Sequence, residues 1–415
     1  TLLIDADSFE EKAIEKAGYA TNPLMDNSLE SYRVINAPIT TLTKESLKEL
    51  GLDTKTAERS KNMFALGMLF YIFNRDLKPA FKYFQTKFGK KDPKLVEINK
   101  IALQQGYNYA DTIEAIESVI SIAPSKMEKG RYRNITGNTA TAWGLMAAAE
   151  RSGRPLFLGS YPITPATDIL LELAKHKSLG VKVFQAEDEI AGICSAIGAS
   201  YTGAMACTST SGPGLSLKSE AIGLAVMTEL PLIIVDVQRG GPSTGLPTKS
   251  EQSDLYQALF GRNGECPVIV IAASTPDNCF YYAYMAAKYS MEHMTPVILL
   301  TDGTLGFGSV LFRIPKVDSL PPINPPIAQP NDPDYKPYRR NPDTLVRQWA
   351  LPGTEGLRHR IGGLEKADII GSVSTDPMNH QHMVDMRAAK VEKLADVLPE
   401  QEIDGPAEGD LLVVS

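Results

Sequence analysis

Four short segments of this 415-residue sequence carry side chains that could act together in catalysis. The segment "YPITP" (161–165) places the hydroxyl of Thr164 between two prolines, which fix their own φ angles and favour extended residues before them. Glu187 follows a second apolar segment, and "TSTSGPG" (208–214) offers small hydroxyls and an open backbone. Arg239 precedes a loop rich in glycine, serine and threonine. Together the segments supply a rigid hydroxyl, a carboxylate, an accessible backbone and a guanidinium.

A small 2-oxo acid is the ligand that this combination suits. A guanidinium binds a carboxylate through two parallel hydrogen bonds, and a rigid hydroxyl can donate to a neighbouring carbonyl or carboxylate oxygen. The electron sink for chemistry on such an acid must come from elsewhere, because the sequence has no P-loop, no GxGxxG after a strand and no visible nucleophile triad. No metal-ligand set is expected in this chain.

Each segment also has an ordinary structural explanation. The prolines can mark nothing more than a rigid turn, and "TSTSGPG" can cap a helix. Glu187 can be an N-cap or a first-turn acid that the helix dipole favours. Arg239 can form a salt bridge on the surface, and the glycine-rich loop after it can simply be mobile. The choice between these explanations and a joint site depends on where the segments lie in the fold.

The elements that must position these residues alternate regularly between residues 135 and 310. Apolar segments predict strands at 155–161, 181–186, 204–211, 231–238, 267–273 and 296–302, separated by helices such as 164–176, 188–203, 215–229 and 250–261. Continuous apolar strands alternating with helices indicate an α/β fold with a doubly wound parallel sheet that is covered on both faces. Ligands bind beyond the carboxyl ends of the strands in such sheets, so the four segments are expected to meet at one crevice.

The flanking regions suggest further domains. Residues 1–125 predict a partial α/β domain, with strands at 1–7 and 31–39 and helices at 58–73, 77–89 and 93–120. Residues 124–134 are polar and basic, which predicts a linker before a domain over 135–313. Nine prolines between residues 315 and 342 predict an extended spacer within 314–405, followed by an amphipathic helix at 382–398. We expect the start of another domain at 410–415, and hence a fragment of a longer polypeptide.

Composition narrows the class of protein. The chain has 43% apolar residues, 22% charged residues and a net charge of −7 without a basic stripe, which argues against nucleic acid as a partner. Its longest apolar run, 63–73, is too short to span a bilayer and predicts a buried helix rather than a membrane segment. The four cysteines are far apart, which predicts free thiols in a reducing compartment, the cytoplasm. Cys194 and Cys207 lie in apolar segments and are expected in the core.

Three of the segments resemble a known family. "GSYPITPATD" (159–168), "FQAEDEIAGICSAIGAS" (184–200) and "GGPSTGLPTKSEQSDL" (240–255) resemble the α subunit of 2-oxoacid:ferredoxin oxidoreductases, and the third is most similar to the 2-oxoglutarate members. Residues 1–120 resemble the γ domain that some members fuse ahead of α. The resemblance extends over essentially the whole chain.

The resemblance implies the missing electron sink and the partners. Family members bind thiamine diphosphate between an α-type pyrimidine domain and a β subunit, which supplies the diphosphate and Mg²⁺ site and a [4Fe–4S] cluster. They oxidatively decarboxylate a 2-oxo acid with coenzyme A to an acyl-CoA and CO₂, pass the electrons to ferredoxin, or run in reverse. The implied assembly is a dimer of heterodimers. The expected substrate is 2-oxoglutarate; pyruvate, a branched 2-oxo acid, a thiamine enzyme without electron transfer, and a non-catalytic scaffold subunit remain as alternatives.

The resemblance also implies roles for single residues. Glu187 corresponds to the glutamate that hydrogen-bonds the aminopyrimidine, Thr164 to the threonine beside the substrate, and Arg239 to the arginine that pairs with the substrate carboxylate. The other expected site residues are Tyr161, Pro162 and Ile163 at the cofactor, and Ser243 and Thr244 at the substrate. The positive end of the following helix favours an ionised Glu187, which in turn favours a protonated pyrimidine nitrogen and a basic amino group. Asp188 and Glu189 inherit no role, because they differ from the small residues of the pyruvate enzymes.

Overall fold

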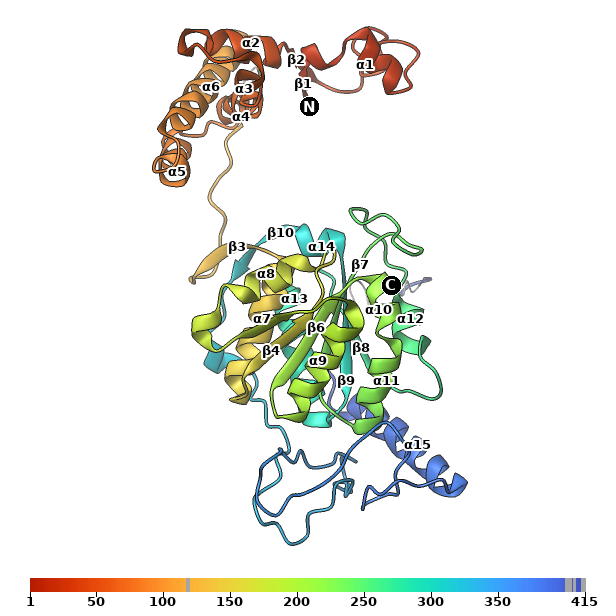
Figure 1. Cartoon of the computed structure of the whole chain (residues 1–415). Helices are drawn as coiled ribbons and strands as arrows, with labels where there is room; N and C mark the ends of the chain where they lie inside the picture. Colours follow the sequence, from red (N-terminus) through yellow and green to blue (C-terminus); the bar gives the residue numbers. More distant parts are fainter. Residues whose placement is uncertain (117–119, 400–404, 406–407, 412–415) are drawn as a thin grey trace. The chain divides into compact units, whose positions relative to one another are not determined.

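The chain forms two compact units, residues 1–128 and 129–415. The computed structural model (Figure 1) describes all residues except 117–119, 400–404, 406–407 and 412–415. Most of the predicted segment 410–415 therefore lies outside the described residues. Each unit has hydrophobic clusters of its own, and the site residues predicted from the sequence all belong to the second unit.

The first unit combines a short parallel strand pair with helices. β1 (Leu2–Asp5) pairs with β2 (Val34–Ala37), and the helices that follow β2 are α2 (Ile39–Ser46), α3 (Thr54–Glu58), α4 (Lys61–Ile72), α5 (Lys78–Phe88) and α6 (Pro93–Thr112). The shorter elements are η1 (Ala6–Ser8), α1 (Glu11–Lys16) and η2 (Lys48–Leu50). Both predicted strands and all three predicted helices are present, although the third helix ends at Thr112 rather than near 120.

The apolar run 63–73 forms a buried helix, as predicted. It lies in α4, whose Phe64, Met68 and Ile72 are buried. Two glycines allow α4 and α6 to cross closely: a Cβ atom on Gly67 would lie 2.0 Å from the carbonyl oxygen of Leu103, and one on Gly106 would lie 1.9 Å from that of Phe64. The unit is therefore held by helix packing that has no room for a methyl group at either position.

A six-stranded parallel sheet forms the centre of the second unit, with strand order β5-β4-β6-β7-β9-β8. The strands are β4 (Leu156–Ser160), β5 (Lys182–Gln185), β6 (Met205–Thr210), β7 (Leu232–Gln238), β8 (Ile269–Ala272) and β9 (Pro296–Asp302). All six coincide with the predicted strands, so the doubly wound parallel sheet is confirmed. The central strands β6, β7 and β9 are buried along their whole length, which explains their continuous apolar sequences.

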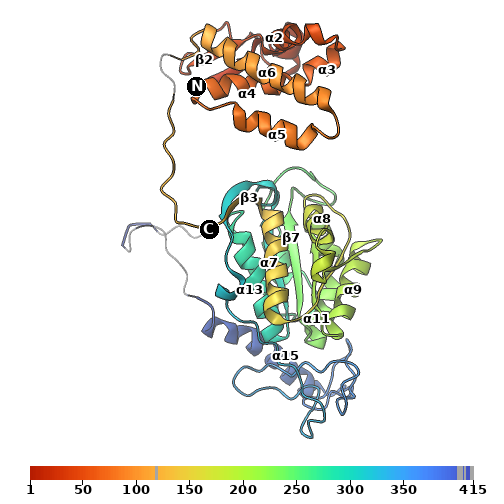
Figure 2. The same ribbon diagram turned by 90° about the vertical axis from the view of Figure 1, so that its left-hand side faces the viewer.

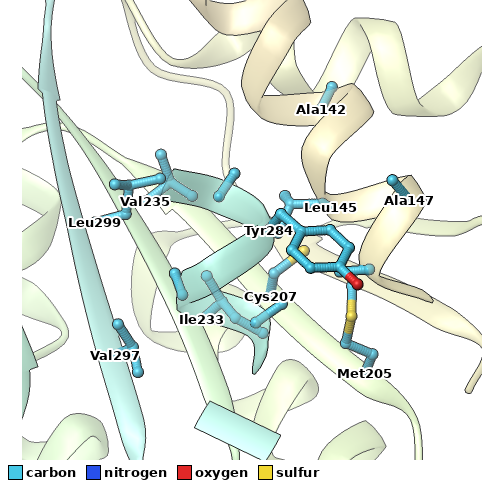
Figure 3. Packing of buried hydrophobic residues seen from close by; sticks show 14 of the residues in the cluster. Ala142, Leu145, Ala147, Met205, Cys207, Ile233, Val235, Tyr284, Val297 and Leu299 are labelled. Atoms are coloured by element: carbon cyan, nitrogen blue, oxygen red, sulfur yellow. The ribbon is translucent and has the colours of Figure 1, made fainter. Parts of the chain in front are cut away.

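Helices cover both faces of this sheet (Figure 2). One face packs against α7 (Gly137–Ser152), α8 (Thr167–Ala174) and α13 (Asn278–His293); the other packs against α9 (Glu189–Tyr201), α10 (Gly212–Leu217), α11 (Ser219–Thr228) and α12 (Leu255–Phe260). The helix predicted at 215–229 is interrupted at Lys218, which separates α10 from α11. On the first face, Leu145 and Tyr284 pack over Ile233, Val235 and Leu299 (Figure 3).

An antiparallel strand pair was not predicted. β3 (Tyr132–Thr136) begins inside the expected linker 124–134 and pairs with β10 (Ser309–Arg313). α14 (Gly303–Phe307) precedes β10, and η3 (Lys177–Leu179) lies between α8 and β5 in the chain. The polar and basic composition of 124–134 concealed the strand, because only Ile135 of β3 is buried.

The proline-rich region folds onto the amino ends of the sheet strands (Figure 1). As its prolines predict, it forms almost no regular structure, apart from η4 (Val317–Ser319), before α15 (Pro377–Glu392) and η5 (Lys393–Asp396). It is not a free spacer, however, because Tyr338 and Trp349 are almost completely buried within it. The expected spacer is therefore an integral covering layer, held by buried ion pairs as well as by apolar contacts.

Candidate functional site

The four predicted segments leave four neighbouring strands. Glu187 follows β5, "YPITP" follows β4, "SGPG" follows β6, and Arg239 directly follows β7. The chain passes from β4 outward to β5 and then crosses to β6 on the other side of β4. The carboxyl ends of β4 and β6 therefore flank a topological switch point, which is the usual ligand position in a doubly wound sheet.

The turn after β4 is held by its main-chain carbonyls. The Thr164 carbonyl accepts a hydrogen bond from Nη1 of Arg239 at 2.7 Å, and the Pro165 carbonyl accepts one from Nδ2 of Asn138 at 2.9 Å. Asn138 is a buried residue of α7, a helix that the sequence analysis did not identify. The Thr164 side chain is exposed, and its hydroxyl has no partner within the described residues. The surrounding structure thus orients the Thr164 hydroxyl by fixing the backbone on both sides of it.

Glu187 does not cap the helix that follows it. The side chain of Asp188 is the N-cap of α9 and accepts from the Ala191 N–H at 2.7 Å, while Glu189 lies buried in the first turn. Glu187 precedes the cap, is exposed, and has no hydrogen-bond partner in the described chain. The Ala186 N–H donates to the Ser160 carbonyl at 2.9 Å, so Glu187 leaves β5 level with the start of the Tyr161 turn. Its carboxylate is therefore available to a ligand.

Arg239 is buried, with 6% of its surface exposed, which excludes a surface salt bridge. Its Nη1 donates to the Thr164 carbonyl, and its Nη2 donates to the Thr244 carbonyl at 2.8 Å. Nε has no partner within the described residues. A guanidinium has five N–H groups, so these two contacts and the buried Nε–H leave one further N–H on each Nη atom. Arg239 thus joins the turn after β4 to the loop after β7 and still has donors for an anionic ligand.

A cavity of about 660 Å³ opens beside Arg239. Its walls include Ser243 and Thr244 of the glycine-rich loop, Glu251 and Asp254 at the end of that loop, and the first turns of α10. The loop is closed on itself, because the Leu246 N–H donates to the Gly240 carbonyl at 2.8 Å. The volume lies within the range of small-molecule sites. Of the predicted site residues, Arg239, Ser243 and Thr244 line this cavity. Thr164 does not line it and is connected to it through the hydrogen bond that Arg239 donates to its carbonyl. Glu187 lies at the end of a different strand.

Buried ionisable residues near the cavity were missed by the sequence analysis. Asp236 lies within β7 and Asp254 at the cavity wall, and burial raises the pKa of both carboxyls. Lys218, at the break between α10 and α11, donates from Nζ to the Glu189 carbonyl at 2.7 Å, and burial lowers its pKa to about 8. An acid inside the apolar strand "PLIIVDVQ" was a visible signal for Asp236. No comparable signal marked Asp254, whose burial depends on the fold.

The cysteines behave differently from one another. Cys207 is buried in β6 as predicted, but Cys194 is exposed, so its predicted core position is wrong. The apolar side of α9 that faces the sheet is formed by Ile193, Ala196 and Ile197, which leaves Cys194 on the outer side. All four cysteines are free thiols. Within the described ranges, no cluster of three metal-ligating side chains occurs and no helix has the length and apolarity to cross a membrane.

The residues fit the pyrimidine half of thiamine diphosphate. An unpartnered carboxylate, Glu187, can accept from a protonated ring nitrogen, and the partly exposed Tyr161, Pro162 and Ile163 offer an adjacent wall at the end of β4. Neither these segments nor the rest of unit two presents a glycine-rich phosphate motif. The donor set therefore suits a cofactor whose diphosphate is bound elsewhere.

Comparison with known proteins identifies the fold and the family that the three sequence segments resemble. A sequence model described as "Pyruvate flavodoxin/ferredoxin oxidoreductase, thiamine diP-bdg" matches residues 148–378, and one described as "Pyruvate ferredoxin/flavodoxin oxidoreductase" matches residues 1–109. The chain is 50% identical, over all of its length, to 2-oxoglutarate oxidoreductase subunit KorA of Mycobacterium tuberculosis, and it spans 63% of that protein. It is 37% identical over 262 residues to 2-oxoglutarate synthase subunit KorA of Methanocaldococcus jannaschii, covering 63% of this chain and 68% of the relative.

A solved structure supports this relation in three dimensions. The 2-oxoglutarate:ferredoxin oxidoreductase from Magnetococcus marinus, determined with 2-oxoglutarate, coenzyme A and succinyl-CoA bound, superposes with a TM-score of 0.82. The match covers 96% of this chain and 70% of that chain, at 32% sequence identity. The similarity therefore includes the arrangement of the elements and is not restricted to short motifs.

Proposed function

Because this chain belongs to the 2-oxoacid:ferredoxin oxidoreductase family, we propose that it is the α-type part of an enzyme that acts on 2-oxoglutarate. The reaction is oxidative decarboxylation with coenzyme A to an acyl-CoA and CO₂, with electrons passed to ferredoxin, or the reverse carboxylation. The observation that carries the proposal is the buried Arg239, with one further N–H on each Nη atom, beside a cavity of about 660 Å³ at the carboxyl end of β7. The relatives named for 2-oxoglutarate favour this substrate over pyruvate and branched 2-oxo acids.

The proposed cofactor is thiamine diphosphate, which supplies the electron sink for decarboxylation when bound. Glu187 would hold the aminopyrimidine through its free carboxylate, beside Tyr161, Pro162 and Ile163. A β subunit would supply the diphosphate and Mg²⁺ site and a [4Fe–4S] cluster, because no phosphate cradle occurs in this chain's sequence. The proposed assembly is a dimer of such heterodimers in the cytoplasm, with ferredoxin as a further partner.

The loop after β7 and the turn after β4 would bind the substrate. Arg239 would bind a substrate carboxylate with its remaining N–H groups, at the cost of little rearrangement because two carbonyls already hold its guanidinium. Ser243 and Thr244 line the same cavity and offer hydroxyls to the ligand. The Thr164 hydroxyl lies at the end of a backbone that Arg239 and Asn138 fix. These residues bind and orient the acid next to the cofactor.

Replacing Glu187 with glutamine tests the proposal. Glu187→Gln keeps the shape and removes the charge, so kcat in the full-length protein assembled with its partner subunit is expected to fall about 10²–10⁴-fold, the range for general acid–base catalysis. The matched control is Asp168→Asn, because Asp168 is an exposed first-turn acid at the start of α8. A Glu187 variant that retains kcat within a few-fold, like the control, would contradict the proposed role.

The same assembly decides between substrates and between classes of function. Initial rates with 2-oxoglutarate, pyruvate and a branched 2-oxo acid, each with coenzyme A and a ferredoxin, give kcat/KM for each acid. The largest kcat/KM is expected for 2-oxoglutarate. Turnover of none of the three by a complex that contains iron and thiamine diphosphate would favour a scaffold role for this chain.

A further inference from the structure

Two acidic side chains meet beneath the cavity that Arg239 lines. Asp236 lies inside β7, is fully buried, and has no hydrogen-bond donor to either carboxylate oxygen within the described residues. The carboxyl group of Asp254, at the cavity wall, is within hydrogen-bonding reach of Asp236, and its own Oδ2 is buried without a donor from the described chain. Two ionised carboxylates in such a contact would repel strongly, whereas a single shared proton converts the contact into a hydrogen bond.

Asp254 ends the loop that Arg239 begins. The N–H of Asp254 donates to Oε1 of Gln238, the last residue of β7, at 2.9 Å. Earlier in the loop, the Gly241 N–H donates to Oε2 of Glu251 at 3.0 Å. The loop that carries Ser243 and Thr244 is therefore tied back to β7 through its backbone and through the Asp236–Asp254 contact.

We propose that Asp236 and Asp254 share one proton, and that the resulting hydrogen bond anchors loop 239–254 in its ligand-binding arrangement. Asp236 is then a positioning residue: it touches no ligand and acts through Asp254 on the loop that forms the cavity wall. The consequence for ligand binding rests on the proposed function, because it takes Arg239, Ser243 and Thr244 as the substrate contacts. The anchoring itself does not depend on which ligand enters the cavity.

The charges around the pair favour one retained proton. Burial, and after it Asp254, raises the pKa of Asp236. Burial also raises the pKa of Asp254, the hydrogen bond from Asp236 opposes this, and the charge of Glu251 adds to it. No cation of the described chain offsets these acids: Arg239 is held by two carbonyls, and Lys218 donates to the Glu189 carbonyl.

The two strands and the helix next to the pair bring no compensating charge either. Asp236 pairs in register with Thr210 of β6 and Leu300 of β9, which are uncharged. Gly212 of α10 lies against the Asp254 carboxylate, where a Cβ atom would be 2.7 Å from Oδ2. At high pH, when both acids are ionised, their repulsion is therefore unscreened and the anchor is lost.

Two substitutions at position 236 separate the shared proton from simple packing. Asp236→Asn keeps the shape and keeps an N–H donor toward Asp254 at every pH. Asp236→Leu removes the hydrogen bond. The infrared spectrum of the full chain at neutral pH is expected to show the C=O stretch of a protonated carboxyl, and Asp236→Asn is expected to lack that band. Absence of the band from the unsubstituted protein would overturn the shared proton.

Hydrogen exchange of the loop tests the anchor without any ligand. The N–H groups of Gly240, Gly241, Leu246 and Lys249 are hydrogen-bonded within the loop, so their exchange reports its opening. With chemical exchange rates corrected for pH, exchange is expected to accelerate about 10–100-fold in Asp236→Leu, the range for losing a hydrogen bond to a charged group, and by less than about threefold in Asp236→Asn. Exchange in the unsubstituted protein is expected to rise with pH, while that of Asp236→Asn stays flat. Identical pH profiles for the two proteins would overturn the anchor even if Asp236→Leu fails to fold.

Kinetics connects the anchor to the cavity. In the assembled enzyme, KM for 2-oxoglutarate is expected to rise with pH in the unsubstituted protein and to stay constant in Asp236→Asn, with kcat unchanged by the substitution. A pH-dependent KM that survives in Asp236→Asn would overturn the link to ligand binding. If exchange follows the prediction but no 2-oxo acid is turned over, the proposed function fails and the anchor stands.

Discussion

Two fully buried carboxyl groups at opposite ends of the same sheet have pKa values that are shifted in opposite directions. Glu229 lies just before β7, where burial alone would raise its pKa, but Lys390 and Arg340 lower it to about 2. Its carboxylate accepts from Lys390 Nζ at 2.7 Å and from Arg340. Asp236 lies near the other end of β7, where burial and then its one charged partner among the described residues, the acid Asp254, raise its pKa. Equal burial thus gives an ion in one place and an acid in the other, because the partners differ.

The two ends of the sheet have different roles. At the amino ends, the covering layer brings cations to Glu229 from positions 111 and 161 residues away, which fixes that layer to the sheet. Burial, together with the positive charges of Arg340 and Arg347, lowers the pKa of Lys390 to about 8. Buried polar atoms without partners occur at both ends, such as Arg239 Nε and Arg340 Nε, but at the carboxyl ends Arg239 lines a cavity and the exposed Glu187 has no partner among the described residues. We therefore expect substitutions at the first end to change stability and substitutions at the second end to change function.

The largest effect is expected at the amino end. Glu229→Gln leaves Lys390 buried without a counter-charge and leaves Arg340 with Asp368 alone, which costs about 3–5 kcal/mol of unfolding free energy for a broken buried ion pair. Both tryptophans, Trp143 and Trp349, belong to the second unit, so urea unfolding followed by tryptophan fluorescence reports on that unit. The control is Asp318→Asn, which removes an exposed partner of Arg151 and is expected to change nothing measurable. Equal stability of Glu229→Gln and the control would show that the ion pairs of Glu229 do not stabilise this end of the sheet.

Arg239→Lys is expected to have the next largest effect, on function. Lysine keeps the charge but cannot hold two carbonyls and a ligand in one plane, so kcat/KM is expected to fall by an amount equivalent to about 1.5–3 kcal/mol. Arg262→Lys is the matched control, because Arg262 also binds main-chain carbonyls, those of Ala258, Leu259 and Cys266, but does not line the cavity. A loss of kcat/KM of the same size in both variants would show that Arg239 acts through packing alone.

The sequence predicted the elements better than the contacts between them. Six sheet strands were found because each is a continuous apolar segment between turn residues. The predicted extended spacer is instead a covering layer, since its prolines exclude helix and sheet but say nothing about burial. The roles of Glu229 and Asp236 were not predicted, because the first depends on cations more than 100 residues away and the second on the arrival of Asp254 at the end of a loop. Asn138 was missed with its helix.

The sequence predicted at which strand ends the site residues lie, but it did not predict their hydrogen-bond partners. Strand order placed the segments of Thr164, Glu187 and Arg239 at neighbouring strand ends, as the alternation of strands and helices predicts. What the sequence could not give was that Arg239 already binds two backbone carbonyls, since a main-chain acceptor has no sequence signature. Asp188 rather than Glu187 caps α9 for a reason that is visible only in the backbone angles at the start of the helix.

The pH dependence of stability is expected to have opposite signs at the two ends of the sheet. The folded pKa of Glu229 is lowered, so its contribution is present above the unfolded value of 4.5 and is lost as pH falls toward about 2. The folded pKa of Asp236 is raised, so stability falls as pH rises above the unfolded value of 3.8, by about 1.4 kcal/mol per pH unit until the folded pKa is reached. Urea unfolding over a range of pH is expected to show that Asp236→Asn removes the second slope. A constant difference in unfolding free energy between Asp236→Asn and the unsubstituted protein would contradict the raised pKa.

The smallest effect concerns the hydroxyl of Thr164. Thr164→Val keeps the β-branch and the carbonyl that Arg239 binds, and removes only a hydroxyl that has no partner in the described chain. Loss of a neutral hydrogen bond to the substrate is expected to lower kcat/KM for 2-oxoglutarate by an amount equivalent to about 0.5–1.5 kcal/mol. The thermal midpoint is expected to stay constant because the side chain is exposed. Thr167→Val, three residues along the same turn at the start of α8, is the control. If Thr164→Val lowers the midpoint and leaves kcat/KM per folded site intact, the prolines around it serve the turn alone, and the unpartnered polar groups at this end of the sheet do not by themselves mark a binding site.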